Sequence, residues 1–313
     1  MGVPLFPQAP FAPFPGGVDL GTVVVMPTAA NAVFLRSIGP QSADPPALTG
    51  KIVPTLAAAL AQIRSGLADT VIALPGHSES VADATMLDNL VPGTKIIGVG
   101  RGSNMPVFRW TATGSQWIIN DADVVIHGLR LRLEGANGVV KAIVSTAADC
   151  VISGCDIEVA SGATAKATIA VELGTGAARN EIVGNRWRGT ATHNVTNGLL
   201  VAGAVEGIRI TDNEMVFSAT AANGNINVSV AALNIMIARN LCLNSHTAST
   251  ACIAFAAAAS TGVCADNRVG TINDGTATAQ GITVGAGCLV RFFENYSDDE
   301  PAKSGILTPG ACT

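Results

Sequence analysis

The segments that decide the fold are IHGLRL from Ile126, ISGCDI from Ile152, IVGNRW from Ile182, ITDNEM from Ile210, IARNLC from Ile237, CADNRV from Cys264 and FFENYS from Phe292. Their starts are 26, 30, 28, 27, 27 and 28 residues apart, and a weaker copy, IIGVGR, begins 30 residues further upstream. A period of this length is typical of a solenoid, in which each repeat forms one coil and contacts only its neighbours.

Each copy begins with an apolar residue, and its fourth position is Asn in five successive copies: Asn185, Asn213, Asn240, Asn267 and Asn295. Apolar and polar positions alternate as they do on a strand with one buried face. Asn tolerates the left-handed conformation of a bend, and its amide can hydrogen-bond to an Asn stacked one coil away. The repeat therefore predicts an all-β, right-handed parallel β-helix of about eight or nine coils with a structural Asn ladder. Ligand binding by these Asn residues is the alternative.

The composition narrows the class of protein. Charged residues make up 13% of the 313 residues, hydrophobic residues 48% and aromatic residues 4%, and the net charge is −5. Such a chain is too apolar for disorder and too poor in aromatic residues for a base-stacking surface. Lys and Arg form no cluster, so we expect neither nucleic acid nor membrane as a partner.

The first residues, MGVPLFPQAP, lack a positive segment and are interrupted by Pro, so we expect no Sec signal. The longest apolar stretch, ACIAFAAAASTGV from Ala251, is too short to span a bilayer. The seven Cys residues include no CxxC pair and read as small buried hydrophobic residues. We expect no disulfide framework, no metal site and no cofactor.

Residues 1–50 differ from the rest, because nine of the fifteen Pro residues fall there. The spacing favours an extended polyproline II arm whose side chains contact a partner; a floppy tail is the alternative. The residues of this partner-binding arm are Pro4, Phe6, Pro7, Pro10, Phe11, Pro13 and Phe14. Short strands are predicted at VVVM from Val23 and AVFLRSI from Ala32.

After the arm, the sequence predicts three further parts. Residues 51–69 contain TLAAALAQIRSG from Thr55, an amphipathic helix with Leu56, Leu60, Ile63 and Leu67 on one face. We expect it to cap the open end of the β-helix. The coils occupy residues 70–297, beginning with TVIALPGHSES, and residues 298–313 form a C-terminal tail.

The stretches DTVIALPGHSES from Asp69 and KIIGVGRGSNMPVF from Lys95, followed by the repeats, resemble the pectin-lyase-like right-handed β-helix superfamily. Within it, the chain looks most similar to β-helix proteins of tailed-bacteriophage virions, and the resemblance covers residues 50–297. That superfamily includes lyases, hydrolases, tailspikes, adhesins and capsid-decorating proteins, so the resemblance implies a fold more than an activity.

Polysaccharide cleavage is the main enzymatic activity that the resemblance implies. Glycoside hydrolysis needs two facing carboxyl groups. The candidates are Asp121 with Asp123, Asp156 with Glu158, Asp212 with Glu214, and Asp298 and Asp299 with Glu300, and solvated turn residues are the alternative for all of them. The set of catalytic motifs that the superfamily's hydrolases carry on successive coils is not found in this sequence.

Lyases of the superfamily hold calcium with several acidic residues and use an Arg or Lys base. Arg186, Arg188 and His193 are predicted near one corner, without acidic residues in phase with them. His77 beside Glu79 is a candidate acid–base pair, with a backbone-bonded turn His as the alternative. We assign no catalytic residue and expect a non-enzymatic protein, with a polysaccharide lyase or hydrolase as the alternative.

Stretches such as ATAANGNINVSVAAL from Ala219 leave small, uncharged residues where a lone solenoid would carry Lys and Glu. An uncharged face favours packing against another copy. We therefore expect a homotrimeric structural protein that decorates or cements a bacteriophage capsid. It would be assembled in the host cytoplasm and lie on the outer capsid surface, in contact with the major capsid protein or another virion protein. A receptor-binding tailspike with polysaccharide depolymerase activity is the alternative, and a secreted adhesin or lyase would need an export signal.

Overall fold

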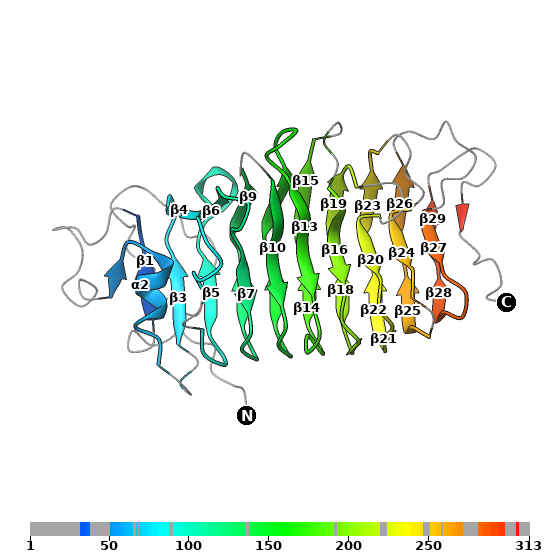
Figure 1. Cartoon of the computed structure of the whole chain (residues 1–313), viewed down its shortest axis with the longest axis horizontal. Helices are drawn as coiled ribbons and strands as arrows, with labels where there is room; N and C mark the ends of the chain where they lie inside the picture. The colour runs from blue at the N-terminus through cyan, green and yellow to red at the C-terminus, as the bar shows by residue number, and fades with distance from the viewer. Residues whose placement is uncertain are drawn as a thin grey trace, which may run out of the picture.

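The structure is a computed structural model that describes residues 32–37, 51–64, 67, 69–87, 90–134, 138–190, 193, 195–219, 224–246, 251–257, 259–271, 281–297 and 305–306. Its strands stack side by side along one long axis (Figure 1). This arrangement confirms an all-β parallel β-solenoid and is consistent with a right-handed parallel β-helix. The predicted Pro–Phe arm and the strand from Val23 lie outside the described residues, as does nearly all of the C-terminal tail.

Three sheets run the length of the solenoid, and we call them sheets I, II and III in the order in which a coil visits them. Sheet I contains, in spatial order, β2 (Ile52–Val53), β1 (Ala32–Leu35), β3 (Thr70–Ala73), β5 (Lys95–Gly98), β8 (Val125–His127), β11 (Val151–Ser153), β14 (Glu181–Val183), β18 (Arg209–Thr211), β22 (Ile235–Ala238), β25 (Thr261–Ala265) and β28 (Leu289–Phe293). Sheet II contains β4 (Ser78–Val81), β6 (Val107–Trp110), β9 (Arg130–Leu133), β12 (Asp156–Ala160), β15 (Arg186–Gly189), β19 (Glu214–Phe217), β23 (Leu241–Asn244), β26 (Arg268–Thr271), β29 (Tyr296–Ser297) and β30 (Gly305–Ile306).

Sheet III contains β7 (Trp117–Ile119), β10 (Val139–Ser145), β13 (Ala167–Leu173), β16 (Asn197–Val201), β20 (Ile226–Val228), β24 (Ile253–Phe255) and β27 (Ile282–Val284). A small additional sheet pairs β17 (Val205–Glu206) with β21 (Ala232–Leu233). Named strands pair in parallel, with the exception of β29 and β30.

Sheet III defines the number of complete coils within the described residues, because it has one strand for each of seven coils from β7 to β27. The pair β3 and β4 before them and the pair β28 and β29 after them contribute to sheets I and II only. The expected eight or nine coils therefore correspond to about seven complete ones with an incomplete coil at each end.

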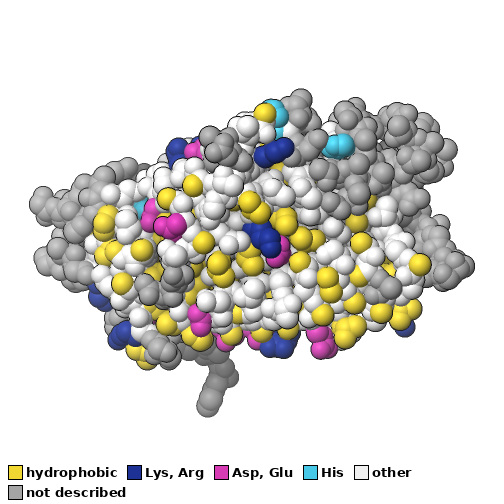
Figure 2. All heavy atoms as spheres, in the orientation of Figure 1, with side chains coloured by type: hydrophobic (Ala, Val, Ile, Leu, Met, Phe, Trp, Pro, Cys, Tyr) yellow, Lys and Arg dark blue, Asp and Glu magenta, His cyan; other side chains and the backbone are white. Residues whose placement is uncertain are grey.

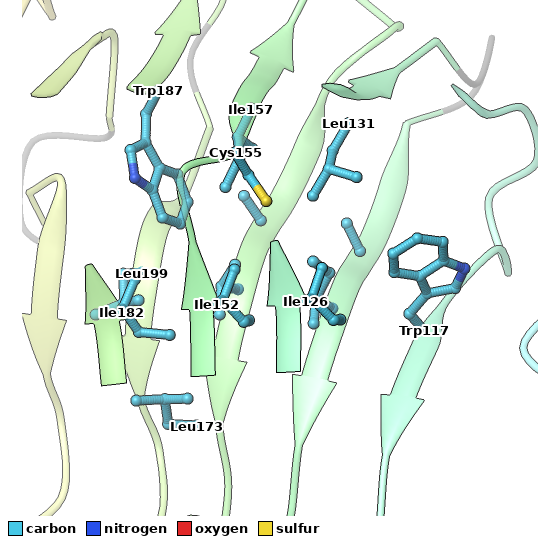
Figure 3. Packing of buried hydrophobic residues seen from close by; sticks show 14 of the residues in the cluster. Trp117, Ile126, Leu131, Ile152, Cys155, Ile157, Leu173, Ile182, Trp187 and Leu199 are labelled. Atoms are coloured by element: carbon cyan, nitrogen blue, oxygen red, sulfur yellow. The ribbon is translucent and has the colours of Figure 1, made fainter. Parts of the chain in front are cut away.

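The six-residue repeats lie in register across neighbouring coils. Their first positions pair along sheet I in the order Ile96, Ile126, Ile152, Ile182, Ile210, Ile237, Cys264 and Phe292. Figure 3 shows three of these side chains in a row inside the solenoid. Each of the three is at most 1% exposed, and burial of such a side chain stabilises the fold by about 1.5–3 kcal/mol. The first positions of the repeats thus form one continuous column of side chains in the core.

An aromatic cluster fills the core near the N-terminal end. Phe108, Trp110 and Trp117 are fully buried, and the Trp117 ring lies 4.9 Å from Phe108 and 5.0 Å from Trp110 between ring centroids. The indole of Trp117 donates to Met86 Sδ at 3.2 Å, and that of Trp110 donates to the Ala142 carbonyl at 3.1 Å. These bonds satisfy the polar ends of two large core side chains.

The helix before the coils is shorter than predicted. Helix α2 (Leu56–Leu60) lies at the N-terminal end beside β1 and β3, with Leu56 and Leu60 in the main core (Figure 1). After the helix, the amide and the side chain of Arg64 both donate to Asp69, at 3.0 Å each. Leu67, predicted on the buried face, is 48% exposed. The 3₁₀ helix η2 (Gly102–Asn104) is the other described helical turn.

Candidate functional site

The five predicted Asn residues stack into a ladder at the corner between sheets I and II. Each is at most 2% exposed. The Nδ2 group of Asn185, Asn213, Asn240 and Asn267 donates to Oδ1 of the next Asn in line, at 3.1, 2.9, 2.9 and 2.9 Å, and the line ends at Asn295. Each of these four also donates its backbone N–H to the same oxygen, at 3.0 to 3.1 Å.

The remaining amide hydrogens of the ladder bond to the core column. Asn213 Nδ2, for example, donates to the Ile182 carbonyl at 2.8 Å, and Asn240 Nδ2 donates to the Ile210 carbonyl at 2.9 Å. The side-chain oxygen and nitrogen are therefore both occupied inside the protein. This geometry makes the ladder a structural element of the corner and leaves it no group for a ligand.

The bend itself is made by the residue before the Asn. The expectation that Asn stands here because it tolerates the left-handed conformation was therefore wrong. The third positions of the repeats have positive φ angles between 48° and 69°, at Gly128, Gly154, Gly184, Asp212, Arg239, Asp266 and Glu294. Gly and Asp adopt this left-handed conformation at low cost. Asn is selected at the fourth position because its amide pairs with its neighbours in the buried corner.

Cys155 occupies the ladder position one coil before Asn185. Its backbone N–H donates to Asn185 Oδ1 at 3.0 Å, so the ladder ends here without a side-chain amide. Burial raises the pKa of the Cys155 thiol to about 12, and Cys150, Cys242, Cys252, Cys264 and Cys288 are buried as well.

We expect these six thiols to resist alkylation in the folded protein, because the thiolate is the reactive form. Iodoacetamide at pH 8, followed by mass spectrometry of the peptides, should modify them only after denaturant is added. Rapid modification of Cys155 in the folded protein would contradict this burial.

The charged residues of the coils gather on sheet II. Its strands contain ten of them, namely Glu79, Arg109, Arg130, Arg132, Asp156, Glu158, Arg186, Arg188, Glu214 and Arg268. The carboxylate of Asp156, 11% exposed, accepts from Arg130 Nε at 3.1 Å and from Arg188 Nε at 2.8 Å. Arg132 Nε donates to Glu158 at 2.9 Å. Both carboxylates of this candidate pair are thus held by guanidinium groups across the strands.

The other described carboxylates are also spread along the solenoid. Asp212 pairs with Arg239 at 2.7 Å, whereas Glu214 faces Arg186 at 3.6 Å, so the two do not form a common site. The Arg239 guanidinium lowers the pKa of the Asp212 carboxyl group. Asp123 lies at a left-handed turn, and Asp298, Asp299 and Glu300 lie outside the described residues.

Acidic residues lie in phase with the two predicted corner Arg residues, which corrects the expectation, because Asp156 pairs in register with Arg186 and Glu158 with Arg188. Arg188 bonds to Asp156 and Arg186 faces Glu214, while His193 Nδ1 lies 2.7 Å from the hydroxyl of Thr190. His77, by contrast, has two side-chain partners and is 1% exposed. Its Nε2 lies 3.1 Å from Glu79 Oε2, and its Nδ1 lies 3.0 Å from Ser37 Oγ. The sequence pattern missed Ser37, because it lies 40 residues away and outside the periodic coils.

Sheet III differs sharply from sheet II in charge. Its seven strands contain two charged residues, Lys141 and Glu172, and these bond to each other at 2.8 Å. The central outward position of each strand forms a column in register: Ile118, Val144, Glu172, Leu200, Asn227, Ala254 and Thr283. The neutral character of this sheet therefore extends over all seven complete coils.

A second outward column of sheet III consists of small residues. It follows the strand ends, where the backbone hydrogen bonds of the sheet continue by one residue, and contains Thr146, Gly174, Ala202, Ser229, Ala256 and Gly285. Figure 2 shows one side of the molecule, on which hydrophobic side chains are widespread and charged side chains occur at a few places. Of the apolar stretch from Ala251, Cys252, Ile253 and Phe255 point into the core, and Ala254 and Ala256 face outward from the sheet.

Among the described residues, no cluster of three or more His, Cys, Asp or Glu side chains could hold a metal ion. The search of the same residues for a helix long and apolar enough to cross a membrane finds none. No protein-family model, no curated protein and no solved structure matches the chain. The fold remains consistent with that of the pectin-lyase-like β-helices.

Proposed function

We propose that the chain is a structural protein that assembles into a homotrimer through sheet III and decorates or cements a bacteriophage capsid. The observation that carries the proposal is the contrast between ten charged residues on the strands of sheet II and one internally paired Lys–Glu couple on those of sheet III. Charged side chains keep a sheet face in water, and a long neutral face favours burial against another protein.

The residues of sheet III support side-by-side packing of identical chains. In the central outward column Ile118, Leu200 and Thr283 are partly exposed, whereas Val144, Asn227 and Ala254 are already buried within the chain, and the neighbouring column contains Gly, Ala, Ser and Thr. Small residues let two backbones approach closely over a long contact. Three solenoids with parallel axes can each turn this face toward a common three-fold axis, which gives a closed assembly.

The assignment to a phage capsid rests on the resemblance of the repeats to virion β-helix proteins. Its direct test is localisation by antibody labelling and imaging of intact particles. Many copies on the shell are expected. Copies confined to the tail tip, together with release of reducing or unsaturated ends from host polysaccharide, would replace the proposal with the depolymerase tailspike.

A charge placed on sheet III should separate the trimer. Ala256 is exposed on the small-residue column, so Ala256→Arg would place a guanidinium in the proposed contact without disturbing the core. An unpaired charge in a buried contact costs several kcal/mol, so the mass measured by light scattering should fall about threefold.

The matched control is Ala265→Arg, the same change on sheet I in the neighbouring strand β25. This variant should keep the mass of the unmodified protein. A wild-type mass of one or two chains, or equal loss of assembly in both variants, would overturn the proposed packing.

A further inference from the structure

Ser37, His77 and Glu79 form a hydrogen-bonded chain at the first, incomplete coil. Ser37 Oγ lies 3.0 Å from His77 Nδ1, and His77 Nε2 lies 3.1 Å from Glu79 Oε2. The Ser side is exposed, whereas the imidazole is 1% exposed. A hydroxyl group, a base within hydrogen-bond reach and a carboxylate that orients the base are the parts of an activated nucleophile.

The partners of the imidazole determine its tautomer in the neutral form. An ionised Glu79 can only accept hydrogen bonds, so the proton of neutral His77 resides on Nε2. Nδ1 then carries the lone pair and faces Ser37 Oγ. This is the arrangement in which a His side chain can remove the hydroxyl proton.

The fold fixes the base and the carboxylate more firmly than a turn alone would. Both oxygens of Glu79 accept the N–H of Leu56, at 3.0 and 2.8 Å, which ties this carboxylate to the first residue of α2. The ring of His77 packs against Phe108, with centroids 5.3 Å apart. Ser37 follows strand β1, which pairs with β3 next to the His77 turn.

The Ser37 hydroxyl has a second acceptor. Its Oγ lies 2.8 Å from the Ser78 carbonyl and accepts the Ser78 N–H at 2.7 Å. The hydroxyl proton can point to this carbonyl or rotate toward His77 Nδ1. The first orientation links the segment after β1 to strand β4, and the second turns the proton toward the imidazole.

We infer that Ser37 is a nucleophile that attacks carboxylic esters, with His77 as its base and Glu79 as the residue that positions His77. Ser37 Oγ bonds to the ester carbonyl carbon while its proton moves to His77 Nδ1. The bond from that carbon to the alkoxy oxygen breaks, and the alcohol leaves with this proton. Water then attacks the acyl group, gives a proton to His77, and releases the acid as Ser37 recovers its proton. This activity goes beyond the proposed scaffold function and does not depend on trimer assembly.

The test is labelling of the full-length protein with a fluorophosphonate probe, which reacts with activated serines, followed by peptide mass spectrometry. We expect an adduct on Ser37 and hydrolysis of p-nitrophenyl acetate. Ser37→Ala should abolish both, and His77→Gln should slow labelling by about 100-fold, as expected for loss of a general base. Thermal unfolding of each variant reports separately on its folding.

Ser80→Ala is the matched control, since Ser80 is an exposed serine on the same strand as Ser78 and should not affect labelling. Labelling of the wild-type protein is enough to overturn the inference, whatever the variants show. No adduct on Ser37, or an adduct that forms no faster than on Ser80, would leave the three side chains with a structural role only.

Discussion

Asn213→Ala should lower the free energy of unfolding by about 3–5 kcal/mol, because it leaves several buried polar groups without partners. The variant loses the acceptor for the backbone and side-chain N–H groups of Asn185, at 3.0 and 3.1 Å. The Ile182 carbonyl loses its amide donor as well. Alanine can adopt the backbone conformation, so the loss reports on the ladder. Denaturant unfolding followed by circular dichroism measures it.

Glu214→Ala is the matched control for this variant. Glu214 is the next residue along the chain, is exposed, and faces Arg186 at 3.6 Å on the surface. Its removal should change stability by less than about 1 kcal/mol. Equal stability of the two variants would mean that the ladder contributes nothing beyond its backbone.

Trp117→Ala should lower the free energy of unfolding by about 3–5 kcal/mol, because it leaves a cavity in the core. Trp117 is fully buried and contacts the rings of Phe108 and Trp110 from the first complete coil. Since solenoid coils interact with their neighbours, the N-terminal coils should lose hydrogen-exchange protection first. Exchange measured by mass spectrometry and denaturant unfolding together check this expectation.

The control here is Val107→Ala, in the same coil but on sheet II, where Val107 is half-buried and precedes the fully buried Phe108. This control should lower the free energy of unfolding clearly less than Trp117→Ala does. A loss of protection that is uniform from the first coil to the last would contradict coil-by-coil stability and indicate a single cooperative unit.

The fold could be predicted because one side chain of each coil occupies the same core position. Ile126 and Ile152 pair directly, and so do their counterparts in later coils. The spacing of the repeats in the sequence therefore gives the register between neighbouring strands of sheet I. The Asn ladder follows from the same phase. Which residue makes the left-handed bend could not be inferred from the sequence, because only the structure shows that Asp212, and not Asn213, has a positive φ angle.

Features outside the period were harder to predict. The helix pattern extended to Leu67, but the helix ends at Leu60, and Arg64 instead bonds to Asp69 just before strand β3. The approach of Ser37 to His77 joins a non-repeating segment to the first turn, and no spacing indicates it. The neutral face was foreseen as a compositional trend, whereas its restriction to sheet III depends on which alternate residues point outward.

The Asn ladder also gives the solenoid a direction of growth. From Asn185 through Asn267, each side-chain amide donates one hydrogen to the Asn of the C-terminal neighbour and the other to a carbonyl of the preceding coil, so a finished coil presents an N–H donor and a carbonyl acceptor to the coil that comes next. During synthesis the N-terminal coils emerge first. Each can then serve as a template whose donors capture the following Asn in register. The chain is therefore suited to fold vectorially, one coil at a time, as it leaves the ribosome.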